Sequence, residues 1–395
     1  MDLHWLKPLL GRPAPFTTVY LDATPSQLSA EAEAADRWKA VRRALERDGA
    51  PAEVLDQIGE RLQVPDGRRT PHGRVLVADA YGLVVDRLLS APPAQSQGMF
   101  GPAPALLQAI HAADETVDLL VVAVDRNGAD LQRVQAGERD AKPTTEVVQG
   151  GHDEVHKTRG GGLDRRSQTR AEDSWQRNAE AVASALDHRV AEDPPDLVLL
   201  TGDVRAVALV RDAVGQPVRD LMVEVPGGGR GEGVHGEAFH TKKVEAVDAY
   251  RARRRSATLD RFRQALGQGN AAVTALDSVV EVLRRGQVAE LVLGDGAAAL
   301  TQRTLWVGPD PLQLATSAGD LAAIGVTSGE ARSMPCDVAL LRAALGQDAG
   351  VTFAGEGEAE LVEGVGALLR WSDGSTPSGG LLSQSADTAR LRTLV

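Results

Sequence analysis

Short apolar runs alternate with helical periodicity along the first part of the chain. Residues 30–48 are rich in alanine and space large apolar side chains three and four positions apart, which predicts a helix. Residues 91–104 hold several prolines and glycines and are predicted to form a loop. The same reasoning predicts a second helix at residues 53–62 and strands at residues 16–22, 74–80 and 82–89. We therefore expect an N-terminal α/β domain over residues 1–115.

A second region begins with an uninterrupted apolar run. Residues 117–124 (VDLLVVAV) have the pattern of a strand that is buried on both faces. Asn127-Gly128 is a strong hairpin signal, so the chain is predicted to return as a second strand. Residues 136–158 show little periodicity. The segments predicted after them are a helix ending near Val190, strands at 196–201 and 221–225, and a helix at 204–214. Alternating strands and helices favour an α/β domain, here over residues 116–238.

The last third repeats this alternation. A long basic helix is predicted over residues 241–266. It is followed by predicted helices at 274–285 and 337–345 and predicted strands at 288–293, near 351 and near 368. We expect a C-terminal α/β domain over residues 239–372, and a polar tail over 373–395.

Composition narrows the function classes. With 395 residues, the chain has room for about two to three domains. Its net charge of -12 argues against a uniformly basic surface for nonspecific nucleic-acid binding, although a local basic patch is compatible with it. The N-terminus lacks the features of a signal peptide, and no stretch approaches the roughly 18 apolar residues of a membrane span, so we expect a cytoplasmic protein without a membrane partner. The single cysteine, Cys336, cannot form an internal disulfide and is predicted to be a core residue.

One segment combines glycines, arginines and the start of a helix. Residues 156–183 read HKTRGGGLDRRSQTRAEDSWQRNAEAVA. Glycines let the backbone approach a ligand closely, a helix N-terminus offers unpaired N–H groups to anions, and arginines pair with phosphates. The pattern of a P-loop is absent. The residues alone leave a phosphate-binding loop and a solvated loop open.

Other candidate motifs point to no cofactor and no metal. His152 and His156 (HDEVH) have a four-residue spacing, but their order is not that of an H-E-x-x-H zinc site. The glycine-rich residues 226–236 lack the spacing of a dinucleotide fingerprint. The carboxylates of Asp203 and Asp295 follow predicted strands and are expected in turns or helix caps. For the basic helix, an RNA contact and a solvated face both stay open.

The order of features from Val117 to about Leu293 resembles the archaeal and eukaryotic class-1 release factors, with their relatives Pelota and the Vms1-type and Balon-like proteins. The matching motifs are VDLLVVAVDRNGADLQRV, the glycine and arginine segment, DLVLLTGD, HTKKVEAVDAYRARRRSATLDRF and TALDSVVEVLRRGQVAELVLGD. This resemblance implies three domains of mixed sheets layered with helices. The central domain would be ribonuclease H-like, and the C-terminal domain an α/β/α sandwich.

The resemblance also implies a role on the ribosome. Release factors have Gly-Gly-Gln in the central loop, where the glutamine positions water against the peptidyl-tRNA ester, and bacterial relatives often have Gly-Gly-x-Ser-Gln. Here Leu163 and Asp164 occupy the Ser and Gln positions, and Gln168 is the nearest glutamine. This departure favours a factor that occupies the A site of idle or stalled ribosomes, in hibernation or rescue under stress, over an enzyme. The alternative is a peptidyl-tRNA hydrolase or tRNA-cleaving rescue factor with Gln168 as its weak catalytic candidate.

The resemblance names the residues and partners to test. The ribosomal RNA would be contacted by residues of the central loop and the helix behind it, namely His156, Lys157, Arg159, Gly160, Gly161, Gly162, Arg165, Arg166, Gln168 and Arg170. The expected partners are the ribosome, with tRNA and a translational GTPase as further candidates. We expect a monomer.

Overall fold

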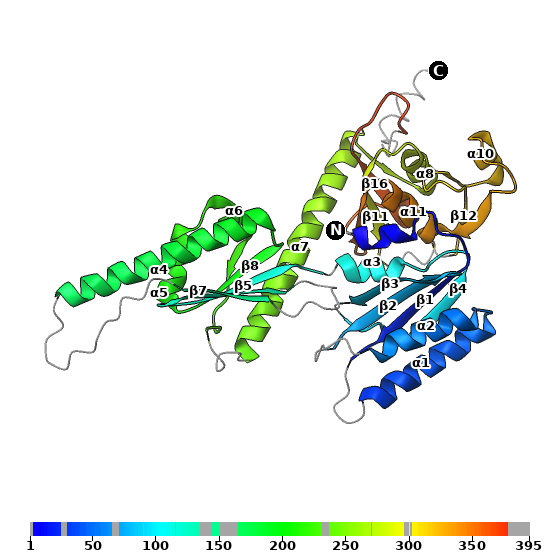
Figure 1. Cartoon of the computed structure of the whole chain (residues 1–395). Helices are drawn as coiled ribbons and strands as arrows, with labels where there is room; N and C mark the ends of the chain where they lie inside the picture. Colours follow the sequence, from blue (N-terminus) through cyan, green and yellow to red (C-terminus); the bar gives the residue numbers. More distant parts are fainter. Residues whose placement is uncertain are drawn as a thin grey trace, which may run out of the picture. The chain divides into compact units, whose positions relative to one another are not determined.

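The fold is mixed α/β and divides into two compact units (Figure 1). One unit comprises residues 1–116 and 254–395, and the other residues 117–253. The computed structural model describes residues 3–24, 30–64, 71–89, 91–114, 116–134, 144–149, 165–230, 237–269, 271–295, 300 and 302–377.

The N-terminal part of the first unit is an antiparallel sheet with helices on both faces. Its strand order is β3 (Gly82–Leu89), β2 (Gly73–Asp79), β1 (Phe16–Asp22) and β4 (Gln97–Gly101). Helices α1 (Ala30–Arg47) and α2 (Ala52–Gln63) pack on one face, against the buried side chains of Val19, Leu21, Leu76 and Ala78. The intervening residues point to the other face, against η1 (His4–Leu9) and α3 (Leu107–Asp114). This alternation follows from the two-residue period of a strand.

The prediction of a loop over residues 91–104 is wrong for β4. This strand pairs with β1 from Phe16↔Gly101 to Tyr20↔Gln97. Its glycine at position 98 faces α1, where a Cβ atom would lie 2.7 Å from Leu45 Cγ. Glycine therefore allows α1 to pack closely on β4, although the glycines and prolines of this segment are typical of a loop.

The C-terminal part of the first unit is a three-layer α/β/α sandwich, as predicted. The sheet order is β10 (Ala272–Thr274), β16 (Val365–Leu369), β11 (Val288–Gly294) and β15 (Gly350–Ala354), with β11 parallel to β15. The C-terminal half of α7 (Glu237–Gln268) covers one face through Leu259, Phe262 and Leu266. Helices α8 (Leu276–Arg284) and α11 (Cys336–Gly346) pack in the other layer.

A small sheet and a short helix in this part were not predicted. Their order is β13 (Leu314–Ala315), β12 (Thr304–Val307) and β14 (Arg332–Pro335), and α10 (Ala318–Ala323) packs beside them. Residues of the N-terminal and C-terminal parts of the unit join in one hydrophobic core, which includes Leu6, Val77, Ile110, Leu340 and Phe353.

The second unit contains a five-stranded sheet in the order β7 (Thr144–Gln149), β6 (Gly128–Val134), β5 (Leu119–Asp125), β8 (Leu197–Gly202) and β9 (Met222–Glu224). Only β6 among these strands runs antiparallel to the rest. This order and these directions are those of a ribonuclease H-like sheet, as predicted. Residues Leu120, Val122 and Val124 face α4 (Arg165–Glu192), α5 (Val204–Ala213) and α6 (Gln216–Leu221). The opposite face, with Leu119 and Val121, packs against Phe239 and Val247 of α7.

Two elements of this unit were missed. β7 lies in the segment that shows little periodicity, and its exposed positions reflect an edge strand paired on one side to β6. Helix α6 is a short connection that begins beside Gly215, whose N–H donates to both Asp187 carboxylate oxygens at 2.9 and 3.1 Å.

Candidate nucleic-acid interface

Helix α4 is held on the sheet by an apolar stripe along its C-terminal part. The buried positions recur at helical spacing, at Ala179, Val182, Ala183, Leu186 and Val190. Asn178 adds a polar link, because its Nδ2 donates to Arg126 O in the β5–β6 turn at 2.7 Å. These contacts fix the direction in which the N-terminal end of α4 points.

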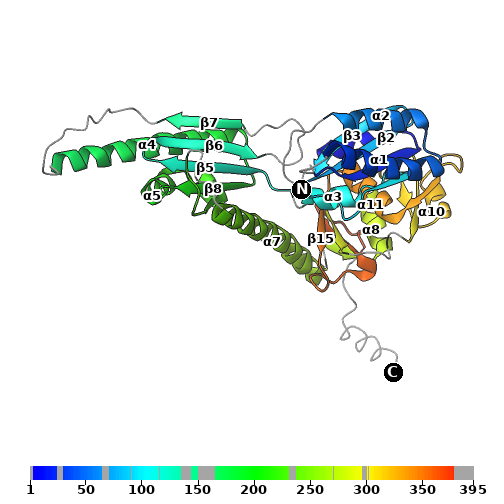
Figure 2. The same cartoon turned by 90° about the horizontal axis from the view of Figure 1, so that it is seen from below.

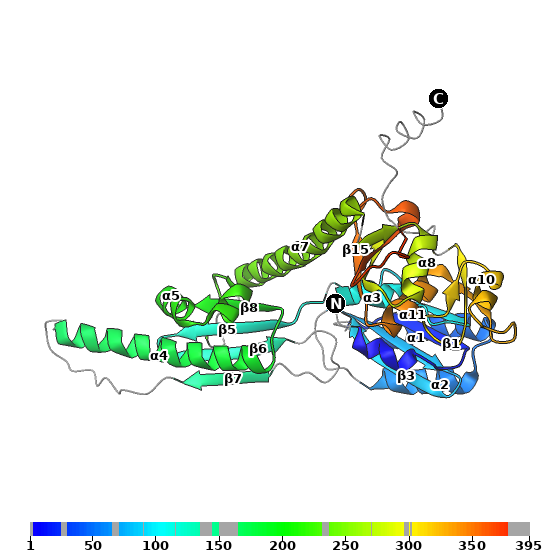
Figure 3. The ribbon, with the colours of Figure 1, turned by 90° about the horizontal axis from the view of Figure 1, so that it is seen from above.

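The N-terminal end of α4 extends past the strands (Figures 2 and 3). Residues 165–173 precede the packed part, and at 1.5 Å per residue they add about 14 Å of helix. The end lies on the side where β5, β7 and β8 finish, which is the side on which open α/β sheets bind ligands. The side chains of these nine residues lie outside the described part of the chain.

The N-terminal end of α4 carries positive side chains where helices usually carry negative ones. The first turn of α4 has no acidic residue and begins with Arg165 and Arg166. A helix N-terminus carries a partial positive charge of about half a unit, so acidic residues stabilise it and arginines do not. Arg166 and Arg170 are four residues apart and therefore share a face of the helix. The sequence concentrates positive charge where a helix already attracts anions.

The predicted contact residues divide into two groups. Arg165, Arg166, Gln168 and Arg170 belong to the first turns of α4. The remaining predicted contacts belong to the loop, which lies outside the described residues, and are His156, Lys157, Arg159, Gly160, Gly161 and Gly162. His152, from the rejected zinc motif, and Asp164 lie in the same segment.

Two side chains beside α4 were missed by sequence reasoning. Arg205, in the first turn of α5, places its Cζ atom 5.3 Å from the centre of the Trp175 ring of α4. Its neighbour Val204 is 86% exposed. Their signal in the sequence is their position directly after Asp203, which caps α5 by accepting from Arg205 N at 2.9 Å and Ala206 N at 3.2 Å. The prediction of a cap at Asp203 is confirmed.

Two other arginines of this unit, Arg133 and Arg230, pair with carboxylates. Arg133 is buried, its Nε donates to Asp118 at 3.1 Å and its Nη1 lies 2.6 Å from Asp193 Oδ2; hydrogen bonding to Asp118 raises its pKa. Arg230 bridges Asp125 at 2.8 Å and Asp130 at 2.9 Å, beside the β5–β6 turn. The single positive charge of Arg230 thus offsets part of the negative charge of these two carboxylates at this edge of the sheet.

The glycine-rich connector after β9 serves packing in its described part. Gly228 N donates to Thr201 Oγ1 at 3.0 Å, and a Cβ on Gly228 would lie 2.6 Å from that oxygen and 2.9 Å from the Phe239 ring. Close backbone packing explains this glycine without a nucleotide.

Cys336 behaves as predicted from its isolation in the sequence. It is fully buried at the start of α11, and burial raises the pKa of its thiol to about 12. Within the described ranges, no three His, Cys, Asp or Glu side chains are grouped as a metal site. No helix in those ranges is long and apolar enough to span a membrane.

Comparison with known proteins places the central segment in context. Residues 118–268 match the family model for bacterial archaeo-eukaryotic release factor family 2. Two Mycobacterium tuberculosis proteins, MT2704 of strain CDC 1551 and Rv2629 of strain H37Rv, are each 27% identical to the chain over 377 residues, which cover 94% of this chain and 96% of theirs.

Comparison with solved structures returns archaeal and yeast translation factors at low overall similarity. The archaeal translation termination factor aRF1 is 15% identical, with coverage of 93% of this chain and 96% of its own and a TM-score of 0.24. Dom34 of S. cerevisiae is 9% identical, with 78% and 83% coverage and a TM-score of 0.37. Archaeal Pelota, from a ribosome-bound model with ABCE1, is 12% identical, with 93% of each chain covered and a TM-score of 0.36.

Proposed function

Because its central segment makes this chain a bacterial relative of the archaeo-eukaryotic release factor family, we propose that it is a translation factor that binds the ribosome in the cytoplasm. It occupies the A site of idle or stalled ribosomes and does not release the peptide. Its contact with ribosomal RNA is made by the glycine loop and the arginines at the start of α4.

The observation that supports this proposal most is the cationic end of α4. A solvated loop would not require a helix that starts with two arginines, lacks an acid in its first turn and extends past its sheet. The two arginines and the missing acid make the electrostatic potential at the helix end more positive, and the extension places this end clear of the sheet. Ribosomal RNA presents closely spaced phosphates, which arginine guanidinium groups bind in pairs of hydrogen bonds.

The acidic character of the whole chain limits where RNA can bind. At a net charge of -12 most of the surface repels phosphate, so contact must be confined to a positive patch. Between His156 and Arg170 the segment contains five arginines and lysines and only Asp164 as an acid. Binding through a few such cations weakens steeply with salt, because condensed counterions are released from the RNA.

The side chain at position 164 supports the proposal that the chain does not release the peptide. In release factors a glutamine amide at this place positions water, whereas Asp164 offers a carboxylate that cannot donate an N–H. We propose that the loop fills the site and leaves the peptidyl-tRNA ester intact. A monomer delivered by a translational GTPase is consistent with this role and stays a proposal.

Sedimentation with vacant bacterial ribosomes tests the binding role. The purified chain should pellet with the ribosomes at about 0.05 M salt and be released progressively as salt increases. Failure to pellet at any salt concentration would contradict a ribosomal function of either kind.

A hydrolytic role is the second candidate, because Gln168 lies in the first turn of α4 between the arginines. Release of labelled peptide from ribosome-bound peptidyl-tRNA distinguishes the two. We expect no release above the rate without protein. Release that disappears in Gln168→Ala, while ribosome binding persists, would replace our proposal with the hydrolase.

A further inference from the structure

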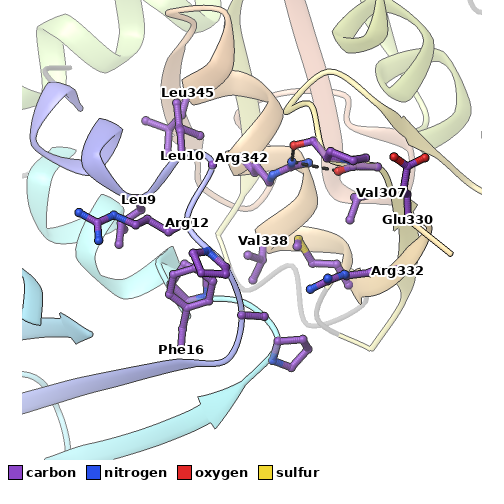
Figure 4. Close-up of a pocket in the computed structure, with 18 of the residues that line it drawn as sticks. Leu9, Leu10, Arg12, Phe16, Val307, Glu330, Arg332, Val338, Arg342 and Leu345 are labelled. Atoms are coloured by element: carbon purple, nitrogen blue, oxygen red, sulfur yellow. Dashed lines mark hydrogen bonds between the residues drawn. The ribbon is translucent and has the colours of Figure 1, made fainter. Parts of the chain in front are cut away.

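A cavity of about 310 Å³ lies within the first unit, far along the sequence from the glycine loop (Figure 4). It is bounded by the chain between η1 and β1 on one side, and by α11, β12 and β14 on the other. Its volume is at the lower end of the range for small-molecule sites. Most of its wall is apolar, through Leu9, Leu10, Phe16, Met334, Val338 and Leu345.

Arg342 of α11 brings an incompletely paired charge into this apolar wall. Its Nη2 donates to the carbonyl oxygens of Gly308 at 3.0 Å and Pro309 at 2.5 Å (Figure 4). Its Nη1 is buried and has no hydrogen-bond partner among the described residues. Burial lowers the pKa of the guanidinium, and the charge of Asp310 offsets this effect in part.

The neighbouring charged groups already have partners. Arg12 at the rim pairs with the buried carboxylate of Asp79 at 3.1 Å. The carboxylate of Asp310 accepts from Leu312 N at 2.8 Å. Glu330 accepts from Thr327 Oγ1 at 2.7 Å and points away from the Arg342 guanidinium in Figure 4. Within the described chain, none of these carboxylates reaches Arg342 Nη1 by hydrogen bond.

A buried cation with an unused donor is costly unless something pairs with it. Arg342 lines the cavity, so an anionic group there would pair with the guanidinium charge, and a small shift of the Arg342 side chain would let Nη1, which is buried in this structure, donate to it. The guanidinium of Arg332, on β14, lies at the same cavity and adds positive charge. The apolar wall would contact the rest of such a ligand and favour an aliphatic body over a second polar group.

We propose that this cavity binds a small organic carboxylate, with its carboxyl group on Arg342 and its aliphatic body against Phe16, Val338 and Leu345. Arg342 is the specificity-determining residue, and the apolar wall sets the size of the ligand. This site is independent of the ribosomal function proposed above.

Calorimetry with three probes tests the site on the full chain. Sodium octanoate should bind one site saturably and raise the melting temperature. Octan-1-ol has the same chain length but no charge, so it cannot form the hydrogen bond between charged groups. Its affinity should therefore be at least roughly tenfold lower than that of octanoate. Inorganic phosphate alone should not bind. Equal affinity for octanoate and octanol, or no octanoate binding at millimolar concentration, would overturn the proposal.

Variants locate the binding. Arg342→Gln should lower octanoate affinity roughly tenfold and leave octanol affinity unchanged, whereas Arg43→Gln, on the exposed face of α1, should change neither. Octanoate affinity that is unchanged in Arg342→Gln would refute the role of this residue. If Arg342→Gln does not fold, the comparison of octanoate with octanol on the unmodified chain still tests whether the site requires a negative charge.

Discussion

Two groups of arginines in the central unit have different charged neighbours. Arg133 and Arg230 are each held between two carboxylates, some of them 100 residues or more away in the sequence. Arg165, Arg166 and Arg170 begin a helix whose first turn contains no acid. The first group ties strands and loops together. The second group lies at a helix end and is preceded by residues 156–164, in which Asp164 is the only acid.

This difference distinguishes arginines that stabilise the fold from arginines that are proposed to bind RNA. A structural arginine should matter for stability and leave RNA affinity unchanged. A binding arginine should matter for affinity, and its loss should leave stability unchanged or improve it. The substitutions below test that separation.

The largest effect is expected for Arg133→Met. The change leaves Asp118 and Asp193 without their shared guanidinium, and should lower the free energy of unfolding by about 2 kcal/mol. The value is below that of a fully buried pair because the Asp193 side chain is 48% exposed. Urea unfolding followed by circular dichroism measures it, with Arg43→Met as the control. A change under about 0.5 kcal/mol would remove Arg133 from the structural group.

Arg170→Gln should weaken ribosome affinity about tenfold at low salt, or about 1.4 kcal/mol, because one phosphate contact is lost. Its unfolding midpoint in urea should stay the same. Arg189→Gln, at the opposite end of α4, is the matched control and should bind as the unmodified chain does. Equal affinities of the two variants would argue against a binding role for the N-terminal end.

Asp203→Ala should cost about 1 kcal/mol of stability, because α5 loses its N-cap. Ribosome pelleting should not change, since this carboxylate serves the helix and not a ligand. Asp203→Asn preserves a capping oxygen and should restore most of the lost stability. A loss of binding in both variants at unchanged stability would show that Asp203 belongs to the interface.

Arg166→Glu should have a small effect on stability, opposite in sign to the effects of Arg133→Met and Asp203→Ala. A negative charge in the first turn of α4 should raise the free energy of unfolding by about 0.5 kcal/mol, while ribosome affinity falls. Thermal unfolding and pelleting on the same preparation measure both quantities. A destabilised variant would indicate that Arg166 has a structural partner.

Much of the fold could be predicted from periodicity. The apolar run at the start of the central unit, the hairpin after it and the helices behind it are where the pattern places them, because their burial is one-sided or complete. The turn itself is Arg126-Asn127, since Gly128 is already the first residue of β6 and pairs with Asp125. Periodicity did not predict β4 or β7. β4 contains a glycine that packs under α1, and β7 is an exposed edge strand. The small sheet around β12 has strands of two to four residues, too short for a period to appear.

The two candidate sites differ in how well they can be predicted from the sequence. The cationic helix end is local, so consecutive residues are sufficient to predict it. The environment of Arg342 depends on carbonyl groups 33 and 34 residues away and on an apolar wall from the N-terminal segment. No local pattern contains that information. The cavity therefore became visible only in three dimensions.

The salt dependence of ribosome binding tests the central claim most directly. The logarithm of the binding constant should fall linearly with the logarithm of the salt concentration, and the double variant Arg165→Gln/Arg166→Gln should reduce the slope by about 2, one for each lost phosphate contact. The double variant Arg43→Gln/Arg47→Gln removes the same charge from α1 and should retain the original slope. If the Arg165→Gln/Arg166→Gln variant also retained the slope of the unmodified chain, the N-terminal end of α4 would not be the RNA contact.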